Sequence, residues 1–378
     1  MAADVSCEID SLLNAVAARV RPEALRRRDE RLLAALRFET VDRPPIVARA
    51  VYPDRFVLPK PWSRYRRFTA AEAFTRPEAM LTNELLEHVV PSLLIGDDHP
   101  LAIRANFGTI QTAAALGASW TRCGDQPPWV EPLTAREKIE RLVYDERAVA
   151  DETVRDKTCA CMRFMLEATQ SRPPLHEALQ IAMPDLQGPL DVAEQFWGAD
   201  VFMAMHDNDP LLQGLLSTIA GAIAELESTY RPLSRDRLYP AAVAQHAWVI
   251  PGTLLLRCDS AIMVSGPMYR DAVLGIDAAL LGRLGGGSLH FCGNGEHLLP
   301  ELLEPESVRG LDLGQSETMD LDRLYAIACE YRKPLLGVRV TPEQLREGDV
   351  IRRFPTGVIF SLMTDDVEKA SAVIAELS

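Results

Sequence analysis

The sequence predicts an α/β protein that folds as a (β/α)8 barrel of the TIM type behind an N-terminal helical extension. Short apolar runs rich in β-branched residues alternate with segments of helical periodicity, and this alternation is typical of parallel sheets. Polar residues follow several of the apolar runs, as they do at the carboxyl ends of barrel strands. The 378 residues accommodate about eight such units. We therefore expect the extension over residues 1–44 and the barrel over residues 45–378.

The composition indicates a globular protein with an acidic surface. Apolar residues make up 47% of the chain and the net charge is −14, so a large core is available, whereas nucleic acid and anionic membranes would be repelled. Seven scattered cysteines fit a reducing compartment better than a disulfide framework. The sequence shows neither an apolar signal segment nor a run of about 18 uncharged apolar residues. We expect a cytoplasmic protein that acts on a small molecule.

Local composition predicts the elements in chain order. Residues 1–40 have helical periodicity, and Pro44 and Pro45 end this segment. Apolar and β-branched runs predict strands over 46–52, 92–98, 103–109, 179–189, 201–205, 252–258, 288–292, 310–313, 334–340 and 357–363. Helical periodicity predicts helices over 134–171, 208–230, 296–303, 320–331 and 366–377, and one that ends at 196.

An open doubly wound sheet is the alternative arrangement for alternating strands and helices. Such sheets bind nucleotides through a Gly-x-Gly-x-x-Gly turn, and other nucleotide-binding proteins use a phosphate loop. Neither motif is present, and the sequence contains no internal repeat of the solenoid kind. The barrel therefore remains the preferred architecture, and nucleotide binding has no support.

His290 and Cys292 form the most informative motif, since they lie two residues apart in an apolar run flanked by glycines. Side chains alternate along a strand, so both would point to the same face. An imidazole nitrogen and a thiolate sulfur are two of the usual ligands of zinc. The alternative is a core strand that contains a hydrogen-bonded histidine and an inert buried cysteine.

Polar residues after the expected strands are further site candidates, because barrel enzymes place their chemistry at the carboxyl ends of strands. These candidates are Asp97, Asn106, Asp185, Gln187, Asp259, Gln315 and Glu317. Arg104 precedes Asn106 on the same expected strand, and His246 and Tyr269 lie near other strand ends. For each of them, a role in turns or packing is the alternative.

Several segments, taken together, resemble the uroporphyrinogen decarboxylase superfamily, which includes the methylcobalamin:thiol (coenzyme M) methyltransferases. The segments are 31–45, 104–109, 185–189, 258–265 with Tyr269, and 289–294. The resemblance implies a (β/α)8 barrel with the site in its C-terminal mouth. It also implies that Asp97 is a catalytic aspartate and that Arg49 binds a substrate carboxylate. The second arginine and the late histidine of the tetrapyrrole decarboxylases are missing, which argues against a porphyrinogen substrate with many carboxylates.

The methyltransferase branch fits the sequence better, and it implies a zinc ion held by His290, Cys292 and a late cysteine. This chain lacks the late cysteine. We expect Glu317 to replace it, since a glutamate accompanies His-x-Cys in the cobalamin-independent methionine synthases and carboxylate oxygen is an ordinary zinc ligand. Asp97 and Asp259 are the expected catalytic acids. The expected substrate-binding residues are Arg49, Asn106, Asp185, Gln187, His246, Tyr269 and Gln315.

These features together predict a zinc-dependent methyltransferase. It would move a methyl group between a corrinoid, or a methylated small molecule, and a thiol or corrinoid acceptor. A corrinoid protein is then a candidate partner. Two alternatives stay open, namely a decarboxylase of a substrate other than a porphyrinogen and a non-catalytic barrel that binds a ligand.

Overall fold

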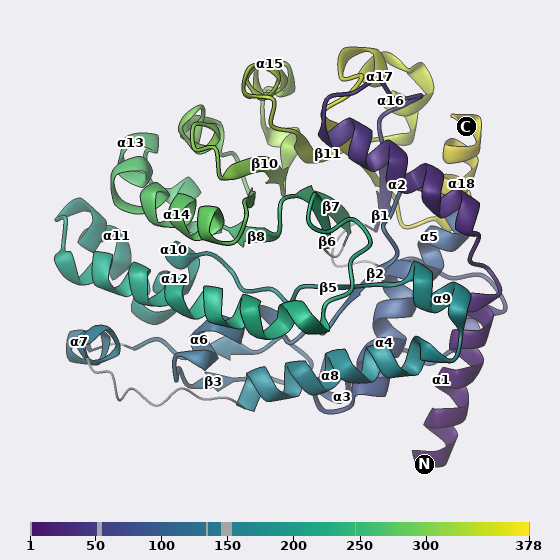
Figure 1. Ribbon diagram of the computed structural model, residues 1–378, viewed down its shortest axis with the longest axis horizontal. Helices are drawn as coiled ribbons and strands as arrows, with labels where there is room; N and C mark the ends of the chain where they lie inside the picture. Colours follow the sequence, from purple (N-terminus) through teal and green to yellow (C-terminus); the bar gives the residue numbers. More distant parts are fainter. Residues whose placement is uncertain (1, 51–54, 134, 145–152, 246, 378) are drawn as a thin grey trace.

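The computed structural model describes residues 2–50, 55–133, 135–144, 153–245 and 247–377 (Figure 1). Its largest sheet has six parallel strands in the order β1 (Ile46–Arg49), β12 (Val358–Met363), β11 (Leu335–Val340), β10 (Val308–Leu313), β9 (Gly287–Phe291) and β8 (Leu254–Arg257). The first strand of the chain thus pairs with the last. The predicted α/β class is confirmed.

A second parallel sheet pairs β2 (Ala102–Arg104) with β5 (Gln180–Ala182). Among the described strands, no ladder joins this pair to the six-stranded sheet. The free edge of β1 is bound by side chains instead, since Ile46 N donates to Asp98 Oδ2 at 2.9 Å and Ala48 N to Asp97 Oδ2 at 2.8 Å. These carboxylates satisfy the edge amides that a neighbouring strand would otherwise bind.

Helices surround the strands in Figure 1. They are α1 (Ala2–Ala17), α2 (Pro22–Leu36), α3 (Ala70–Thr75), α4 (Pro77–Glu84), α5 (Val90–Ile95), α6 (Gln111–Ala115), α7 (Arg136–Tyr144), α8 (Thr153–Gln170), α9 (Pro173–Ala178), α10 (Pro189–Trp197), α11 (Asp200–His206), α12 (Pro210–Tyr230), α13 (Gly266–Tyr269), α14 (Gly275–Arg283), α15 (Leu321–Tyr331), α16 (Pro342–Glu347), α17 (Asp349–Arg353) and α18 (Val367–Glu376). In the described part of the chain, no helix has the length and apolar character needed to cross a membrane.

Two of the predicted strands are helices. Residues 92–98 belong mostly to α5, which ends at Ile95 and is capped by Gly96 with a φ of 79°, and residues 201–205 lie in α11. Both are short apolar runs, and periodicity alone cannot distinguish a buried strand from a buried helix over so few residues. Gly96 adopts the left-handed conformation that ends many helices, and this signal favoured the helix.

An antiparallel hairpin that the sequence did not predict lies near the centre of Figure 1. It consists of β6 (Ala242–Gln245) and β7 (Trp248–Pro251). Its buried side chains form one apolar cluster with residues of β1, β8, β11 and β12, and with Leu32 and Leu36 of α2. Ala102 of β2, Ala182 of β5 and Ala244 of β6 form a second cluster. The hairpin therefore supplies core to both parallel sheets.

Candidate metal centre and adjoining cavity

Three potential metal ligands meet at the carboxyl ends of two neighbouring strands. His290 lies on β9, Cys292 follows β9, and Asp259 follows β8; their ligand atoms all lie within 4.8 Å of one another. His290 Nε2 is 3.4 Å from Cys292 Sγ and 3.5 Å from Asp259 Oδ1. These separations fit one tetrahedral zinc ion, since ligand atoms at the usual bond lengths lie about 3.5 Å apart. We call Asp259, His290 and Cys292 the metal cluster.

Asp312 of β10 holds His290 from the other side of the ring. The two residues are paired in register across the strands, and His290 Nδ1 is 2.8 Å from Asp312 Oδ2. Burial lowers the pKa of His290, but the charge of Asp312 and hydrogen bonds to Asp312 and Cys292 outweigh burial and raise the pKa to about 10. A carboxylate on one ring nitrogen is the usual support of a zinc-binding histidine, because it orients the other nitrogen toward the metal.

Asp191, in the first turn of α10, supports the segment that carries Asp259. Its two carboxylate oxygens accept hydrogen bonds from Asp259 N at 3.0 Å and from Ser260 N at 2.8 Å. Asp259 Oδ1 in turn accepts a hydrogen bond from Cys292 N at 2.7 Å. The side chain of Asp259 is 41% exposed and Cys292 is exposed, so a molecule from solvent can reach the cluster.

A second polar network adjoins the cluster through Arg257, the last residue of β8. Arg257 is paired in register with His290, and its Nε donates to Asp185 Oδ2 at 2.7 Å. Gln187 Nε2 donates to Asp185 Oδ1 at 2.7 Å. Burial raises the pKa of Asp185, but the charges of Arg257 and Arg104 outweigh it and lower the pKa. Asp185 is therefore an ionised group beside the metal cluster.

Asp185 also lines a cavity of about 320 Å³ formed by α3, α4 and the segments that follow β2 and β3. Its polar lining includes Glu84, Arg104, Asn106 and Arg122, and its apolar lining includes Phe74, Met80, Pro127 and Pro128. The volume is at the lower end for small-molecule sites. We call this space the Arg104 cavity.

Part of the predicted site is brought together and part is not. Asp259, His290 and Cys292 form the metal cluster, while Asp185 and Asn106 line the Arg104 cavity and Gln187 binds Asp185. Gln315 is exposed and lies near Gly293, the residue after Cys292. A β-carbon placed on Gly293 would be 3.8 Å from Gln315 Oε1. His246 lies outside the described residues.

Glu317, the expected third zinc ligand, is not part of the metal cluster. Its carboxylate lies 2.5 Å from Arg339 Nη1, and its side chain is 49% exposed. Asp259 takes its place. The two carboxylates follow β10 and β8, which flank β9 on opposite sides, so only the path of each loop decides which one meets His290.

Asp97 and Tyr269 are buried and form hydrogen bonds with other parts of the fold. Asp97 is 2% exposed and accepts hydrogen bonds from Ser92 Oγ at 2.6 Å and from Ala48 N. Tyr269 is fully buried, and its hydroxyl contacts Asp277 and lies 3.3 Å from Cys258 Sγ. The catalytic role of Asp97 and the substrate contact of Tyr269 stay predictions, and both side chains are buried.

Arg49, which the resemblance implies as a carboxylate-binding residue, contacts an aromatic ring in this structure. Its guanidinium carbon lies 4.8 Å from the centre of the Trp248 ring, a cation–π contact with the central hairpin. Arg49 thus contacts the hairpin, although its side chain is also exposed at the end of β1.

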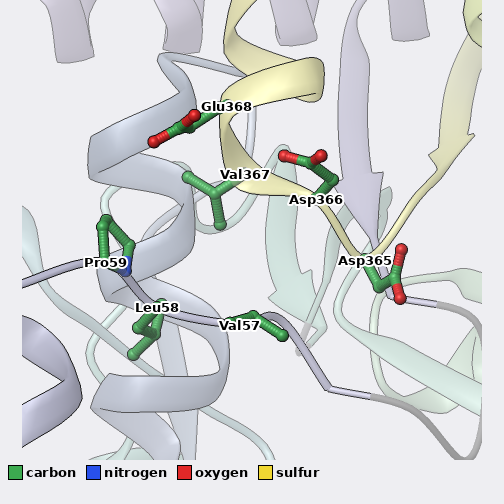
Figure 2. Close-up of a pocket in the computed structure, with 7 residues that line it drawn as sticks. All are labelled: Val57, Leu58, Pro59, Asp365, Asp366, Val367 and Glu368. Atoms are coloured by element: carbon green, nitrogen blue, oxygen red, sulfur yellow. The ribbon is translucent and has the colours of Figure 1, made fainter.

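A separate cavity of about 390 Å³ opens where β12 ends and α18 begins, and Val57, Leu58 and Pro59 form its other wall (Figure 2). Figure 2 shows that the carboxylates of Asp365, Asp366 and Glu368 stay apart and do not meet at one point. Asp366 caps α18 by accepting a hydrogen bond from Lys369 N. We assign these acidic groups no ligand.

Sequence reasoning missed the supporting residues Asp312, Arg257 and Asp191. A signal existed for the first two, because a charged residue within an apolar strand requires a buried partner. Glu84 and Arg122 of the cavity carried no such signal, since both lie outside the expected strands.

Comparison with known proteins adds no relative. No family model matches the chain, and no curated protein matches it.

Proposed function

We propose that this protein is a zinc-dependent methyltransferase whose metal is held by His290, Cys292 and Asp259. The observation that carries the proposal is the meeting of imidazole, thiol and carboxylate within 4.8 Å at the exposed end of parallel strands. Three protein ligands and one open position are typical of catalytic zinc, whereas structural zinc sites usually have four protein ligands. The proposal revises the third ligand from Glu317 to Asp259.

The residues of the chain have separate tasks in this proposal. Asp312 fixes the ring of His290, and Asp191 fixes the backbone of Asp259. Zinc, when bound, would lower the pKa of a thiol at its open position and so supply a thiolate nucleophile. The methyl group would pass between a corrinoid, or a methylated small molecule, and that thiol or a corrinoid acceptor. The exposure of Cys292 leaves room for such a partner.

We further propose that the eight parallel strands are an interrupted (β/α)8 barrel. The pairing of β1 with β12 supports this interpretation, because a closed barrel joins its first strand to its last. The ladder would be interrupted on either side of the β2–β5 pair, where the hairpin supplies the packing. Residues 1–44 are then an extension of a barrel that works in the cytoplasm.

Zinc analysis of purified variants tests the proposed function. We expect near-stoichiometric zinc after reconstitution of the wild-type protein, and a loss of most of it in Cys292→Ala and in Asp259→Asn, because each variant removes a ligand. Glu317→Gln is the matched control and should retain the metal. Methyl transfer from methylcobalamin to a small thiol, followed by the cobalamin spectrum, should require the bound zinc.

Two results would contradict this proposal. Absence of zinc after reconstitution would remove the metal and leave the non-catalytic barrel as the simpler interpretation. If the Asp259→Asn variant keeps its zinc and the Glu317→Gln variant loses it, the third ligand is Glu317, as expected from the sequence.

A carboxy-lyase acting on a small organic acid is the second candidate, because Glu84 and Arg104 line the same cavity. Burial raises the pKa of Glu84 to about 7 against the opposing charge of Arg104. A guanidinium could hold the carboxylate of the acid while a neutral Glu84 protonates the carbon that loses carbon dioxide. This reaction needs no metal, so zinc analysis separates the two candidates.

A further inference from the structure

The Arg104 cavity contains two guanidinium groups with unused hydrogen-bond donors. Arg104 is 7% exposed, and within the described part of the chain neither its Nε nor its Nη1 has a hydrogen-bond partner. Nη1 of Arg122, which follows β3 (Trp120–Thr121), is also buried and without a partner among the described residues. An unpaired buried donor on a charged group is costly, so such groups normally bind a ligand or another side chain.

The carboxylates around the cavity do not fully satisfy Arg104. Asp185 lies 3.6 Å from Arg104 Nη1, beyond hydrogen-bond distance, and accepts the closer hydrogen bonds of Arg257 and Gln187. Glu84 accepts a hydrogen bond from the backbone amide of Arg104 at 2.8 Å, which leaves the two guanidinium donors unused. The cavity can therefore take up one more negative group next to Arg104.

Arg55, Glu87 and Asp125 also line the cavity, but Glu87 pairs with Arg55 at 2.8 Å and Asp125 Oδ1 accepts a hydrogen bond from Ala71 N at 3.3 Å. Another part of the wall is apolar. Phe74 of α3, Met80 of α4 and the pair Pro127 and Pro128 line it. The guanidinium carbon of Arg122 lies 5.7 Å from the centre of the Phe74 ring. A ligand that fills about 320 Å³ of this shape has an acidic group at one end and an apolar body at the other.

We infer that the Arg104 cavity binds the substrate of this protein as a small organic carboxylate, with the acid group on Arg104 and Arg122 and the apolar body on Phe74 and Met80. This inference rests on the proposed function in one respect, namely that the reaction of the bound carboxylate takes place at the metal cluster. Asp185 connects the two places, because it lines the cavity and binds Arg257 beside His290. A planar carboxylate matches the planar donors of a guanidinium.

Calorimetric titration with benzoate tests the inference, because benzoate is a planar carboxylate on an apolar ring. Arg104→Met and Arg122→Met should each weaken benzoate binding about tenfold or more, since each removes charge-assisted hydrogen bonds. Arg346→Met is the matched control, because Arg346 pairs with Glu376 on the surface and does not line the Arg104 cavity. This variant should bind benzoate as the wild type does. Arg122→Met changes a loop residue, so it tests the cavity without disturbing β2.

Three further probes define what would overturn the inference. Benzamide has the shape of benzoate without its charge, and equal binding of the two would exclude the guanidiniums as the recognition element. Phenyl phosphate or inorganic phosphate binding tighter than benzoate would replace the carboxylate with a phosphate ligand. No binding of benzoate by wild-type protein at millimolar concentration would refute the site.

The same titration on Cys292→Ala separates this inference from the proposed function. Benzoate binding should be unchanged there, because the cavity and its arginines do not require zinc. Loss of zinc with retained benzoate binding would support the cavity, whereas retained zinc with no benzoate binding by the wild type would support the metal cluster alone.

Discussion

Asp277 on α14 shows how a single buried carboxyl makes stability depend on pH. It is fully buried, its Oδ1 has no hydrogen-bond partner among the residues that the structure describes, and burial raises its pKa to about 7 despite hydrogen bonds from Tyr269 and Cys258. Its pKa in the unfolded chain is near the ordinary 3.8. Between these two pKa values the folded state holds a proton that the unfolded state has released. The contribution of Asp277 to the free energy of unfolding is therefore fully present below about pH 4, falls as the pH rises, and is lost once the pH has passed about 7.

We expect Asp277→Asn to reduce this loss. One unit of pKa difference corresponds to about 1.4 kcal/mol, so the wild-type protein should lose a few kcal/mol more unfolding free energy between pH 5 and pH 8 than the variant does. Urea unfolding at several pH values measures the difference. Asp271→Asn is the control, because the side chain of Asp271 is 68% exposed. Parallel pH curves for wild type and Asp277→Asn would show that this carboxyl does not titrate as described.

The metal cluster also depends on how closely α10 approaches β8. Gly188 precedes α10, and a β-carbon at this position would lie 2.2 Å from the carbonyl oxygen of Arg257. The contact sets α10 against the end of β8, and Asp191 then reaches the amides of Asp259 and Ser260. Only glycine permits this approach.

Gly188→Ala should therefore push α10 away from β8. We expect a loss of about 1–3 kcal/mol of unfolding free energy, as for other overpacked sites, together with weaker zinc binding because Asp259 is displaced. Gly221→Ala is the matched control. Gly221 lies within α12 and has open space around its β-carbon position, so the change should stabilise the helix by up to about 1 kcal/mol. Unaltered stability and zinc content in Gly188→Ala would contradict the proposed contact.

The elements themselves were predictable to different degrees. The strands β9 to β12 follow from mostly apolar runs bounded by glycine or proline, and their positions match the expected ranges closely. The run 92–98 became a helix, and the hairpin β6–β7 was not expected, because its residues are buried on both faces and show no alternation of polar and apolar side chains.

Over the molecule as a whole, the hairpin is the largest departure from an expected barrel. Trp248 is 5% exposed, belongs to the apolar cluster that joins the hairpin to four strands and α2, and contacts Arg49. We expect Trp248→Ala to cost about 3–5 kcal/mol, the usual cost of removing a large core side chain, with the whole protein unfolding in one transition. Thermal and urea unfolding followed by circular dichroism measure this.

Trp129→Ala is the matched control for this change. Trp129 is 66% exposed, so its removal should alter the unfolding free energy by no more than about 0.5 kcal/mol. If Trp248→Ala were equally mild, or if it unfolded one sheet before the other, the hairpin would not be the common core of the two sheets.

The sequence by itself determined the alternation of strands and helices, the parallel class of the sheet, and the position of His290 and Cys292 two residues apart at the carboxyl end of one strand. These are local properties, since side-chain direction along a strand depends only on spacing. Tertiary structure alone decided which carboxylate joins them. Strand β9 lies between β8 and β10, and register places Arg257 and Asp312 on either side of His290, while the loops bring Asp259 and not Glu317 to the ring. The Arg104 cavity likewise depends on α3, α4 and the segment after β3 meeting in space, because contacts between distant segments are fixed by packing and not by spacing along the chain.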